Sequence, residues 1–223
     1  MIVAIDGPAA SGKSTVARQL AERLGFAYLD TGAMYRAVAV EALRRGIATD
    51  DGDALGELSR TVTISFEHEG GSPLPTRVTL DGRDVTVEIR TPQADAAVSP
   101  VSAQPQVREA MVAQQRRAAA SESDTVLEGR DIGSVVFPGA ELKVFLTAGT
   151  QERARRRASD MEARGTPMPE SEVRAKLETR DLHDSTRAAS PLTRVADAFA
   201  LDTTCMTIEQ VVGAIASWVE ERR

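Results

Sequence analysis

Apolar residues recur at two different spacings along this chain, and the two spacings predict alternating strands and helices. Short apolar runs predict strands near residues 2–6, 26–29, 125–128, 142–146 and 197–201. Apolar residues three or four positions apart predict helices near residues 13–24, 32–45, 106–120, 150–164, 170–184 and 207–221. The last helix is expected to face the core with a stripe that runs from Ile208 to Val219. Strands that alternate with helices in this way are typical of a parallel sheet covered on both faces.

The segment 61–88 departs from this alternation and follows a period of two. Apolar and polar residues alternate over 61–66, 76–80 and 83–87, and turn residues separate the three runs. Asp81-Gly82 is a hairpin signal of the kind that joins antiparallel strands. We therefore expect a small antiparallel three-stranded sheet inserted into the α/β body.

A glycine-rich stretch follows the first predicted strand and opens the first predicted helix. It consists of Gly7, Pro8, Ala9, Ala10, Ser11, Gly12, Lys13, Ser14 and Thr15. It matches G-x-x-x-x-G-K-[ST], the phosphate-binding loop of nucleoside-triphosphate enzymes. The glycines allow a tight loop whose N–H groups point at phosphate oxygens, and the helix dipole favours negative charge there. Lys13 is expected to reach the β- and γ-phosphates, and the Ser14 hydroxyl to ligate Mg²⁺.

Composition narrows the class of protein. A length of 223 residues with 42 % hydrophobic content suits one α/β domain with a small insert. No run approaches the roughly 20 apolar residues of a membrane span, and no signal-peptide pattern is present, so a cytoplasmic protein is expected. Cys205 is alone, which excludes an intramolecular disulfide, and it is expected to be buried.

The charges favour a small anionic ligand over a nucleic-acid polymer. The net charge is −6, whereas proteins that bind a nucleic-acid backbone usually carry a basic face. The chain has only three lysines, Lys13, Lys143 and Lys176, beside many arginines. Because the arginine fork suits bidentate phosphate contacts, clustered arginines would indicate a small polyphosphate as the target.

Two polar clusters follow predicted strands, where open α/β sheets bind ligands. Thr31 and Gly32 begin a helix, and Arg36 lies one turn further on, which predicts either a second anion site or a capped helix with an exposed arginine. The stretch Glu128-Gly129-Arg130-Asp131 follows the third core strand. Its position favours a functional role, and a surface ion pair is the alternative.

Arginines also gather in the helix near 150–164. Arg153, Arg156 and Arg157 share one face because they lie at i, i+3 and i+4. Taken alone, this pattern fits a solvated charged helix. Beside the Gly/Pro break at 165–169, it also fits a lid that closes over the transferring phosphoryl group.

The next helix carries Arg180 and Asp184, and Arg187 falls on the same face if the helix continues. An intrahelical ion pair is the simpler interpretation of this spacing. A triphosphate site with several separate arginines indicates phosphoryl transfer to an anionic acceptor. A phosphate acceptor is already nucleophilic near neutral pH, so such a reaction needs no general base.

Together these motifs resemble the bacterial cytidylate kinases, within the nucleoside monophosphate kinase group of P-loop kinases. The resemblance runs from end to end, through residues 5–8, 30–36, 88–91, 107–110, 129–133, 135–138, 152–157, 180–187 and 191–192. It implies an α/β P-loop three-layer fold with a parallel central sheet, a helical lid and a small antiparallel β insert in the monophosphate-binding region. The implied parts of the single chain 1–223 are a core of about 1–35, 105–150 and 188–223, a monophosphate-binding region of about 36–104 and a lid of about 155–187.

The resemblance also implies the reaction and the residues that perform it. A member transfers the γ-phosphoryl group of ATP to CMP, and to dCMP, with Mg²⁺, and is expected to be a monomer without nucleic-acid or membrane partners. The acceptor phosphate is implied to lie on Arg36, Arg130 and Arg187, near Thr31. Ser99, Arg108 and Asp131 are implied to read the cytosine edge, and Arg180 and Asp184 to contact the ribose. ATP is implied to lie on residues 7–15, with Arg153 near the adenine and Arg157 on the phosphates. The implied catalytic residues are Lys13, Arg130, Arg157 and Arg187.

Three questions stay open at this point. Many monophosphate kinases have glycine after the loop lysine and hold Mg²⁺ through water, so Ser14 leaves direct coordination undecided, with Asp30 a candidate for an outer contact. A kinase for another nucleotide or for a hydroxy acid would carry the same loop. A GTP-binding switch usually reads guanine with N-K-x-D, and this chain contains no asparagine.

Overall fold

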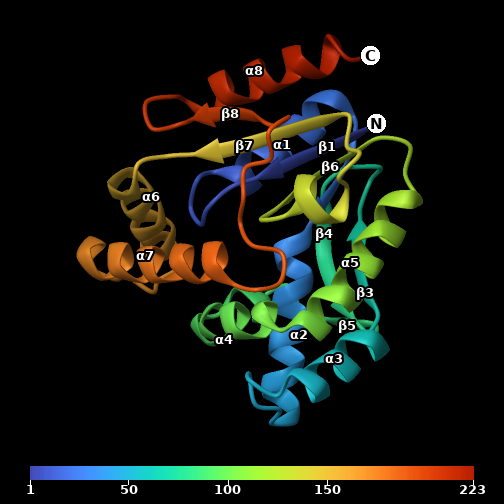
Figure 1. The fold of residues 1–223 in the computed structure, drawn as a ribbon, viewed down its shortest axis with the longest axis vertical. Helices are drawn as coiled ribbons and strands as arrows, with labels where there is room; N and C mark the ends of the chain where they lie inside the picture. The colour runs from blue at the N-terminus through green and yellow to red at the C-terminus, as the bar shows by residue number, and fades with distance from the viewer.

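The computed structural model describes residues 1–223 and contains two separate sheets (Figure 1). The larger sheet has the order β2-β6-β1-β7-β8, and all its neighbouring strands are parallel. These strands are β1 (Ile2–Asp6), β2 (Ala27–Asp30), β6 (Thr125–Gly129), β7 (Leu142–Thr147) and β8 (Phe199–Asp202). The predicted parallel sheet is confirmed. Because the strands are parallel, their carboxyl ends meet at one edge, where the loops that follow them gather.

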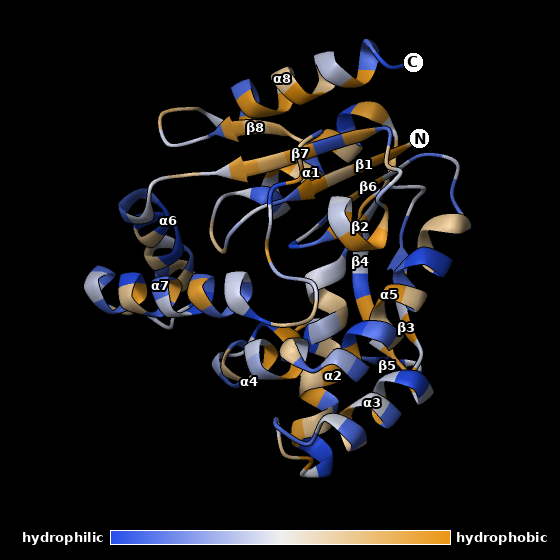
Figure 2. Ribbon diagram, in the orientation of Figure 1, coloured by the Kyte–Doolittle hydropathy of each residue, from blue (hydrophilic) through white to orange (hydrophobic).

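Helices cover both faces of this sheet, as the apolar spacing predicted. One face packs against α1 (Lys13–Leu24) and α8 (Ile208–Glu220), and the other against α2 (Thr31–Arg45) and α5 (Pro105–Ala120). Residues on successive positions of β1 face opposite sides, so Val3 and Ile5 join the first core and Ala4 joins the second. Figure 2 shows the strands as strongly hydrophobic between helices of mixed hydropathy.

The region between α2 and α5 holds the second sheet and two helices that the spacing did not predict. The antiparallel sheet has the order β3-β4-β5, which confirms the predicted insert. Its surroundings are α3 (Gly52–Thr61), β3 (Ile64–His68), β4 (Pro75–Leu80), β5 (Arg83–Asp84), the helical turn η1 (Glu88–Arg90) and α4 (Pro92–Ala103). The strand β5 is shorter than the predicted strand 83–87. The Val85 N–H still donates to the Val78 carbonyl oxygen at 2.9 Å, but the Val78 N–H donates to the Thr86 hydroxyl at 2.9 Å and not to a backbone carbonyl.

The helices α6 (Thr150–Ala163) and α7 (Glu170–Thr186) project from the carboxyl edge of the sheet (Figure 1). A small apolar cluster joins them and consists of Ala9, Ala154, Val173 and Leu177. Since Ala9 belongs to the glycine-rich loop, this helix pair packs directly on that loop. The helix α7 ends at Thr186, and the backbone of Arg187 is extended, so the helix does not continue far enough to place Arg187 on the face of Arg180 and Asp184.

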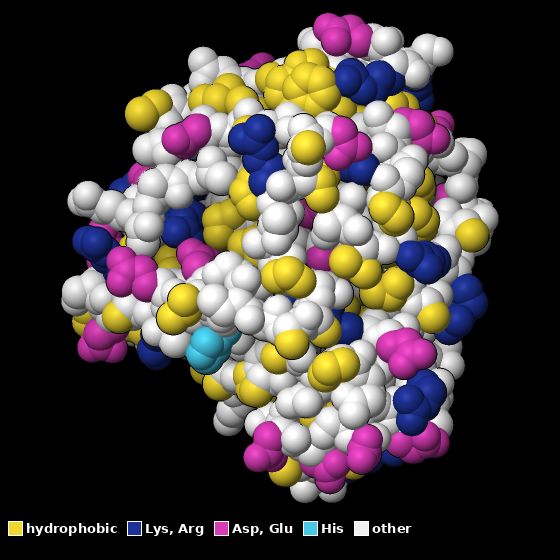
Figure 3. Space-filling view, in the orientation of Figure 1, with side chains coloured by type: hydrophobic (Ala, Val, Ile, Leu, Met, Phe, Trp, Pro, Cys, Tyr) yellow, Lys and Arg dark blue, Asp and Glu magenta, His cyan; other side chains and the backbone are white.

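Two predicted burials are also wrong. Cys205 is exposed, because its turn after β8 buries Thr203 instead, whose hydroxyl donates to the Thr147 carbonyl oxygen at 3.0 Å. Ile208 is 44 % exposed and begins α8 at the rim of a cavity. Figure 3 shows acidic and basic side chains interspersed on one face of the molecule. None of the helices combines the length and apolar character that crossing a membrane requires.

Candidate active site

Backbone geometry explains why the loop between β1 and α1 contains glycines. Gly7 has φ +151°, and a Cβ atom there would lie 2.0 Å from the carbonyl oxygen of Leu146 on β7. Gly12 has φ +93° and forms the N-cap of α1. Only glycine fits these two positions without strain, so the loop wraps closely over the strand ends. The free N–H groups at the start of α1 then make an anion site.

Lys13 is buried at the start of α1, and its ammonium group lacks a carboxylate partner. Its Nζ donates to the Pro8 carbonyl oxygen at 2.8 Å, and Lys13 as a whole is only 5 % exposed. Burial and, to a smaller extent, repulsion from Arg130 lower the pKa of Lys13 to about 7. An anion beside this group would restore its charge, which is what a triphosphate would supply.

Oxygen donors gather on the other side of the loop. The Ser14 hydroxyl donates to Glu128 Oε1 at 2.6 Å. Burial and, to a smaller extent, repulsion from Glu128 raise the pKa of Asp30 to about 6. The chain has no cluster of three or more acidic, histidine or cysteine ligands that could enclose a metal alone. This donor set fits Mg²⁺, which is usually held by one or two carboxylates together with phosphate oxygens and water.

A single cavity of about 750 Å³ connects the loop with the arginine-rich strand ends. Its walls include loop residues Ala9 to Thr15 and most of the other predicted site residues. These are Thr31, Arg36, Arg108, Arg130, Asp131, Arg157, Arg180, Asp184 and Arg187. They come from α2, α5, the end of β6, α6 and the end of α7, so the fold collects residues that are distant in sequence.

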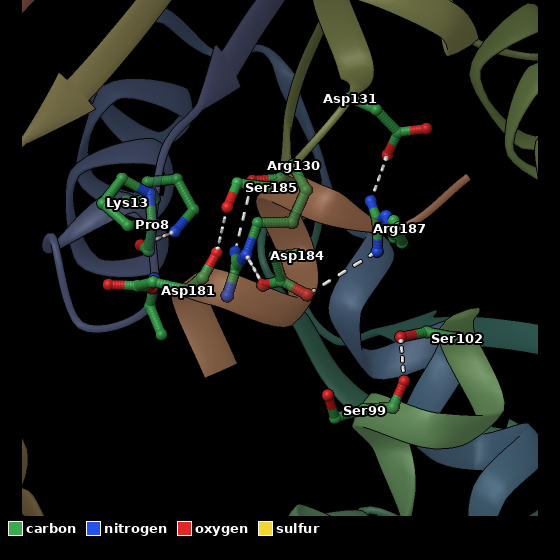
Figure 4. Close-up of polar contacts among 12 residues, drawn as sticks. Pro8, Lys13, Ser99, Ser102, Arg130, Asp131, Asp181, Asp184, Ser185 and Arg187 are labelled. Carbon is green, nitrogen blue, oxygen red and sulfur yellow. Dashed lines mark hydrogen bonds and ion pairs between the residues drawn. The ribbon is translucent and has the colours of Figure 1, made fainter. Parts of the chain in front are cut away.

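The end of the cavity away from the loop holds a chain of alternating charges (Figure 4). Arg108 donates to Asp131 at 2.5 Å, and both residues are 3 % exposed. Burial opposes the charge of Arg108, but Tyr35 and Asp131 beside it leave the pKa of its guanidinium raised. Arg187 lies 4.0 Å from Asp131 and 3.7 Å from Asp184.

Asp184 continues this chain toward the loop. It accepts from Arg130 Nε at 2.9 Å (Figure 4). Although burial acts in the opposite direction, Arg130 and Arg180 hold the pKa of Asp184 below its usual value. Burial and the charge of Arg130 together lower the pKa of Arg180 to about 10. The buried Arg180 Nε has no protein acceptor, so this guanidinium is available to a ligand.

Four predicted site residues do not line the cavity. Arg153 is 6 % exposed and donates to the carbonyl oxygens of Ala9 and Ala148 and to Asp181, so protein atoms occupy its guanidinium. Ser99 touches the site only indirectly, because Ser102 donates to its carbonyl oxygen at 3.2 Å (Figure 4). Ser102 is the one of these two serines that faces the cavity, and its carbonyl oxygen accepts from Arg108. Gly7 and Pro8 also do not line the cavity, whose loop wall begins at Ala9.

The sequence model described as "Cytidylate kinase" matches residues 3–221. This chain belongs to the cytidylate kinase family. The "Cytidylate kinase" of Pelotomaculum thermopropionicum is 48 % identical over 99 % of this chain and 96 % of its own length. That of Limosilactobacillus fermentum is 48 % identical over 98 % and 95 %, and that of Desulfitobacterium hafniense 45 % identical over 99 % and 93 %. The predicted family and the predicted class, a nucleoside monophosphate kinase, are confirmed.

One wall of the cavity was not predicted from the sequence. It follows β8 and consists of Thr203, Met206, Thr207, Ile208 and Val211. Arg156 joins this wall to the loop, since it donates to the Thr203 carbonyl oxygen at 2.8 Å and to the Ser11 carbonyl oxygen at 3.4 Å. The position of β8 in the parallel sheet is a usable signal, because the segment after it must emerge at the same edge as the loop.

Proposed function

We infer that this protein transfers the γ-phosphoryl group of ATP to CMP, giving ADP and CDP, and that it also accepts dCMP. One observation carries this inference. A single cavity joins a triphosphate-binding loop to the buried Arg108–Asp131 pair, which presents both a donor and an acceptor to a nucleobase. Family membership supports the same reaction.

The acceptor phosphate needs positioning more than activation. Arg36, Arg130 and Arg187 are proposed to hold it, because all three line the cavity and lie on different elements. Lys13 and Arg157 are proposed to stabilise the negative charge that spreads over the transferring phosphoryl oxygens. The phosphate oxygen of CMP attacks in line, and ADP leaves from the opposite side. The arginines also offset the repulsion between the two anionic substrates.

We propose that Mg²⁺ binds beside Ser14 and Glu128, with Asp30 as an outer contact. The carboxylates of Glu128 and Asp30 and the hydroxyl of Ser14 are hard oxygen donors, which is the ligand type that Mg²⁺ prefers. When bound, Mg²⁺ would neutralise charge on the β- and γ-phosphate oxygens.

The two ends of the cavity suggest where each base lies. We propose that the adenine of ATP lies against Arg156 and the wall after β8, in place of the Arg153 contact predicted from the sequence. At the other end, Arg108 and Asp131 are proposed to read cytosine. The role predicted for Ser99 stays a prediction, and Ser102 is the more accessible serine.

The division of the chain is likewise proposed. The core would comprise about 1–35, 105–150 and 188–223, the acceptor region about 36–104 and the lid about 155–187. A monomer and a cytoplasmic location also stay predictions. Light scattering at several protein concentrations tests the first, and cell fractionation tests the second.

A coupled ADP-release assay with Mg²⁺-ATP tests the function directly. The acceptors compared should be CMP, dCMP, UMP, AMP, GMP, dTMP and shikimate. Fast turnover confined mainly to CMP and dCMP is expected. A preference for another acceptor would leave the triphosphate loop in place and reject the base assignment.

Replacing Arg180 with methionine should lower kcat/KM for CMP by roughly 10- to 100-fold. A charged hydrogen bond contributes about 1.5–3 kcal/mol, and Arg180 Nε is buried without a protein acceptor. The proposed ribose contact predicts that the ratio of CMP to dCMP turnover also changes. Arg174→Met is the matched control, because Arg174 lies on the same helix, is exposed and pairs only with Glu178. Unchanged kinetics with both acceptors would reject the role.

A further inference from the structure

Asp95 joins two arginines that reach the cavity from opposite sides. One carboxylate oxygen accepts from Arg36 on α2, and the other accepts from Arg157 on α6. These partners lie 59 and 62 positions away in the sequence. No other carboxylate forms an ion pair with either arginine. Asp95 therefore connects the acceptor region to the lid through two charge-assisted contacts.

The position of Asp95 is set by its own helix. It lies in the first turn of α4, where the Thr91 side chain caps the helix by accepting from the Ala94 N–H at 3.3 Å. The Asp95 N–H donates to the Thr91 carbonyl oxygen at 3.0 Å. A carboxylate is also favoured at this end of a helix by the dipole. The bridge is thus anchored on a rigid element rather than on a loop.

The bridge leaves both arginines able to bind substrate. Arg36 uses its Nη1 for Asp95 and for the Ile89 carbonyl oxygen, so its Nε and Nη2 have no protein acceptor. Arg157 uses only its Nη2, so its Nε and Nη1 are also without one. Both side chains line the cavity, whereas Asp95 does not. A contact that blocked the arginines would have engaged more of their donors.

We propose that Asp95 is a positioning residue that holds Arg36 and Arg157 together, so that the acceptor phosphate and the transferring phosphoryl group meet donors already in place. This proposal rests on the roles inferred above for the two arginines. Each arginine has a long side chain whose ordering is entropically costly, and one carboxylate orders both before substrates bind. Asp95 also offsets the repulsion between the two guanidinium groups.

The first test is the kinetics of Asp95→Ala with CMP and Mg²⁺-ATP. We expect kcat to fall by about tenfold or more, because misplacement of a positioning group by an ångström is enough for that loss. Asp95→Glu should recover most of the activity, and Asp95→Asn should recover less, since an amide oxygen replaces only one of two acceptors. Asp95→Ala should slow the enzyme less in an Arg157→Ala background than in the wild type, because only Arg36 is then left for Asp95 to position. Losses that multiply, or an unchanged kcat, would overturn the proposal.

The second test uses no substrate and therefore separates this proposal from the proposed function. Hydrogen–deuterium exchange of the nucleotide-free protein should be faster in α6 and in the first turn of α4 when Asp95 is alanine. Asp124→Asn is the matched control, because Asp124 pairs with the N-terminal amine at the opposite edge of the sheet. Identical exchange in wild type and Asp95→Ala would contradict the bridge. If the wild-type enzyme does not phosphorylate CMP, the proposed function is rejected, but the exchange result still tests the bridge.

Discussion

Replacing Lys13 with methionine is expected to lower kcat by roughly two to three orders of magnitude and to make the nucleotide-free protein more stable. The loss of activity follows from removal of the charge that faces the transferring phosphoryl oxygens. The gain in stability follows from burial. Lys13 is 5 % exposed and has a neutral carbonyl oxygen as its hydrogen-bond partner. Its buried charge therefore lowers the free energy of unfolding.

The pH dependence gives this prediction a definite sign. The pKa of Lys13 falls from about 10.5 in the unfolded chain to about 7 in the fold, so the unfolded chain binds more protons between these values. Stability of the wild type therefore rises as pH increases from about 7 to about 10. The melting temperature of Lys13→Met should exceed that of the wild type by about 5 °C at pH 7, and the difference should shrink toward pH 10.

Two measurements check this account. Thermal unfolding without nucleotide compares the wild type, Lys13→Met and the control Lys176→Met, whose side chain is exposed on α7. Mg²⁺-ATP should then raise the melting temperature of the wild type and of the control much more than that of Lys13→Met. A less stable Lys13→Met protein at pH 7 would show that burial of the ammonium group does not strain the fold.

The phosphate loop was predictable because its signal is local. Residues 7–15 specify the turn, the close approach to β7 and the start of α1 within one short stretch, and the predicted helix 13–24 coincides with α1. The parallel sheet was predictable for a similar reason, since each buried strand is a short apolar run between helices.

The two missed helices show how packing overrides local preference. The helix α4 contains Pro100 and two serines, and a proline inside a helix is costly in isolation. It is stable because Ala94, Val98 and Val101 pack into the core beside α2. The helix α3 did carry a usable signal, because Asp51 caps it by accepting from the Ala54 N–H at 3.0 Å.

Side-chain partners across the cavity were the least predictable feature. The i, i+3, i+4 pattern placed Arg153, Arg156 and Arg157 on one helix face but gave no means of telling their partners apart. In the fold, each arginine donates to a different partner. Arg153 donates to Asp181, Arg156 to the turn after β8, and Arg157 to Asp95. Such assignments depend on how distant elements pack, which a helical spacing does not contain.

Replacing Asp131 with asparagine is expected to lower kcat/KM for CMP by roughly 100-fold and to raise kcat/KM for UMP. The exocyclic amino group of cytosine donates a hydrogen bond to a carboxylate. Uracil has an oxygen at that position, which a carboxylate repels. An asparagine side chain can donate or accept, so it removes both the attraction and the rejection. The pair Arg108–Asp131 is buried, so the same change should also destabilise the fold by about 3–5 kcal/mol.

The lost stability does not obscure the specificity, because both acceptors are offered to the same folded fraction of enzyme. The ratio of kcat/KM for CMP to that for UMP cancels the amount of active protein and reports only how the site treats the two bases. Asp50→Asn, at an exposed position without an ion pair, is the control and should keep the wild-type ratio. If Asp131→Asn loses activity on CMP and UMP in equal proportion, the carboxylate only neutralises Arg108 and Arg187. The base must then be read by other groups in the cavity.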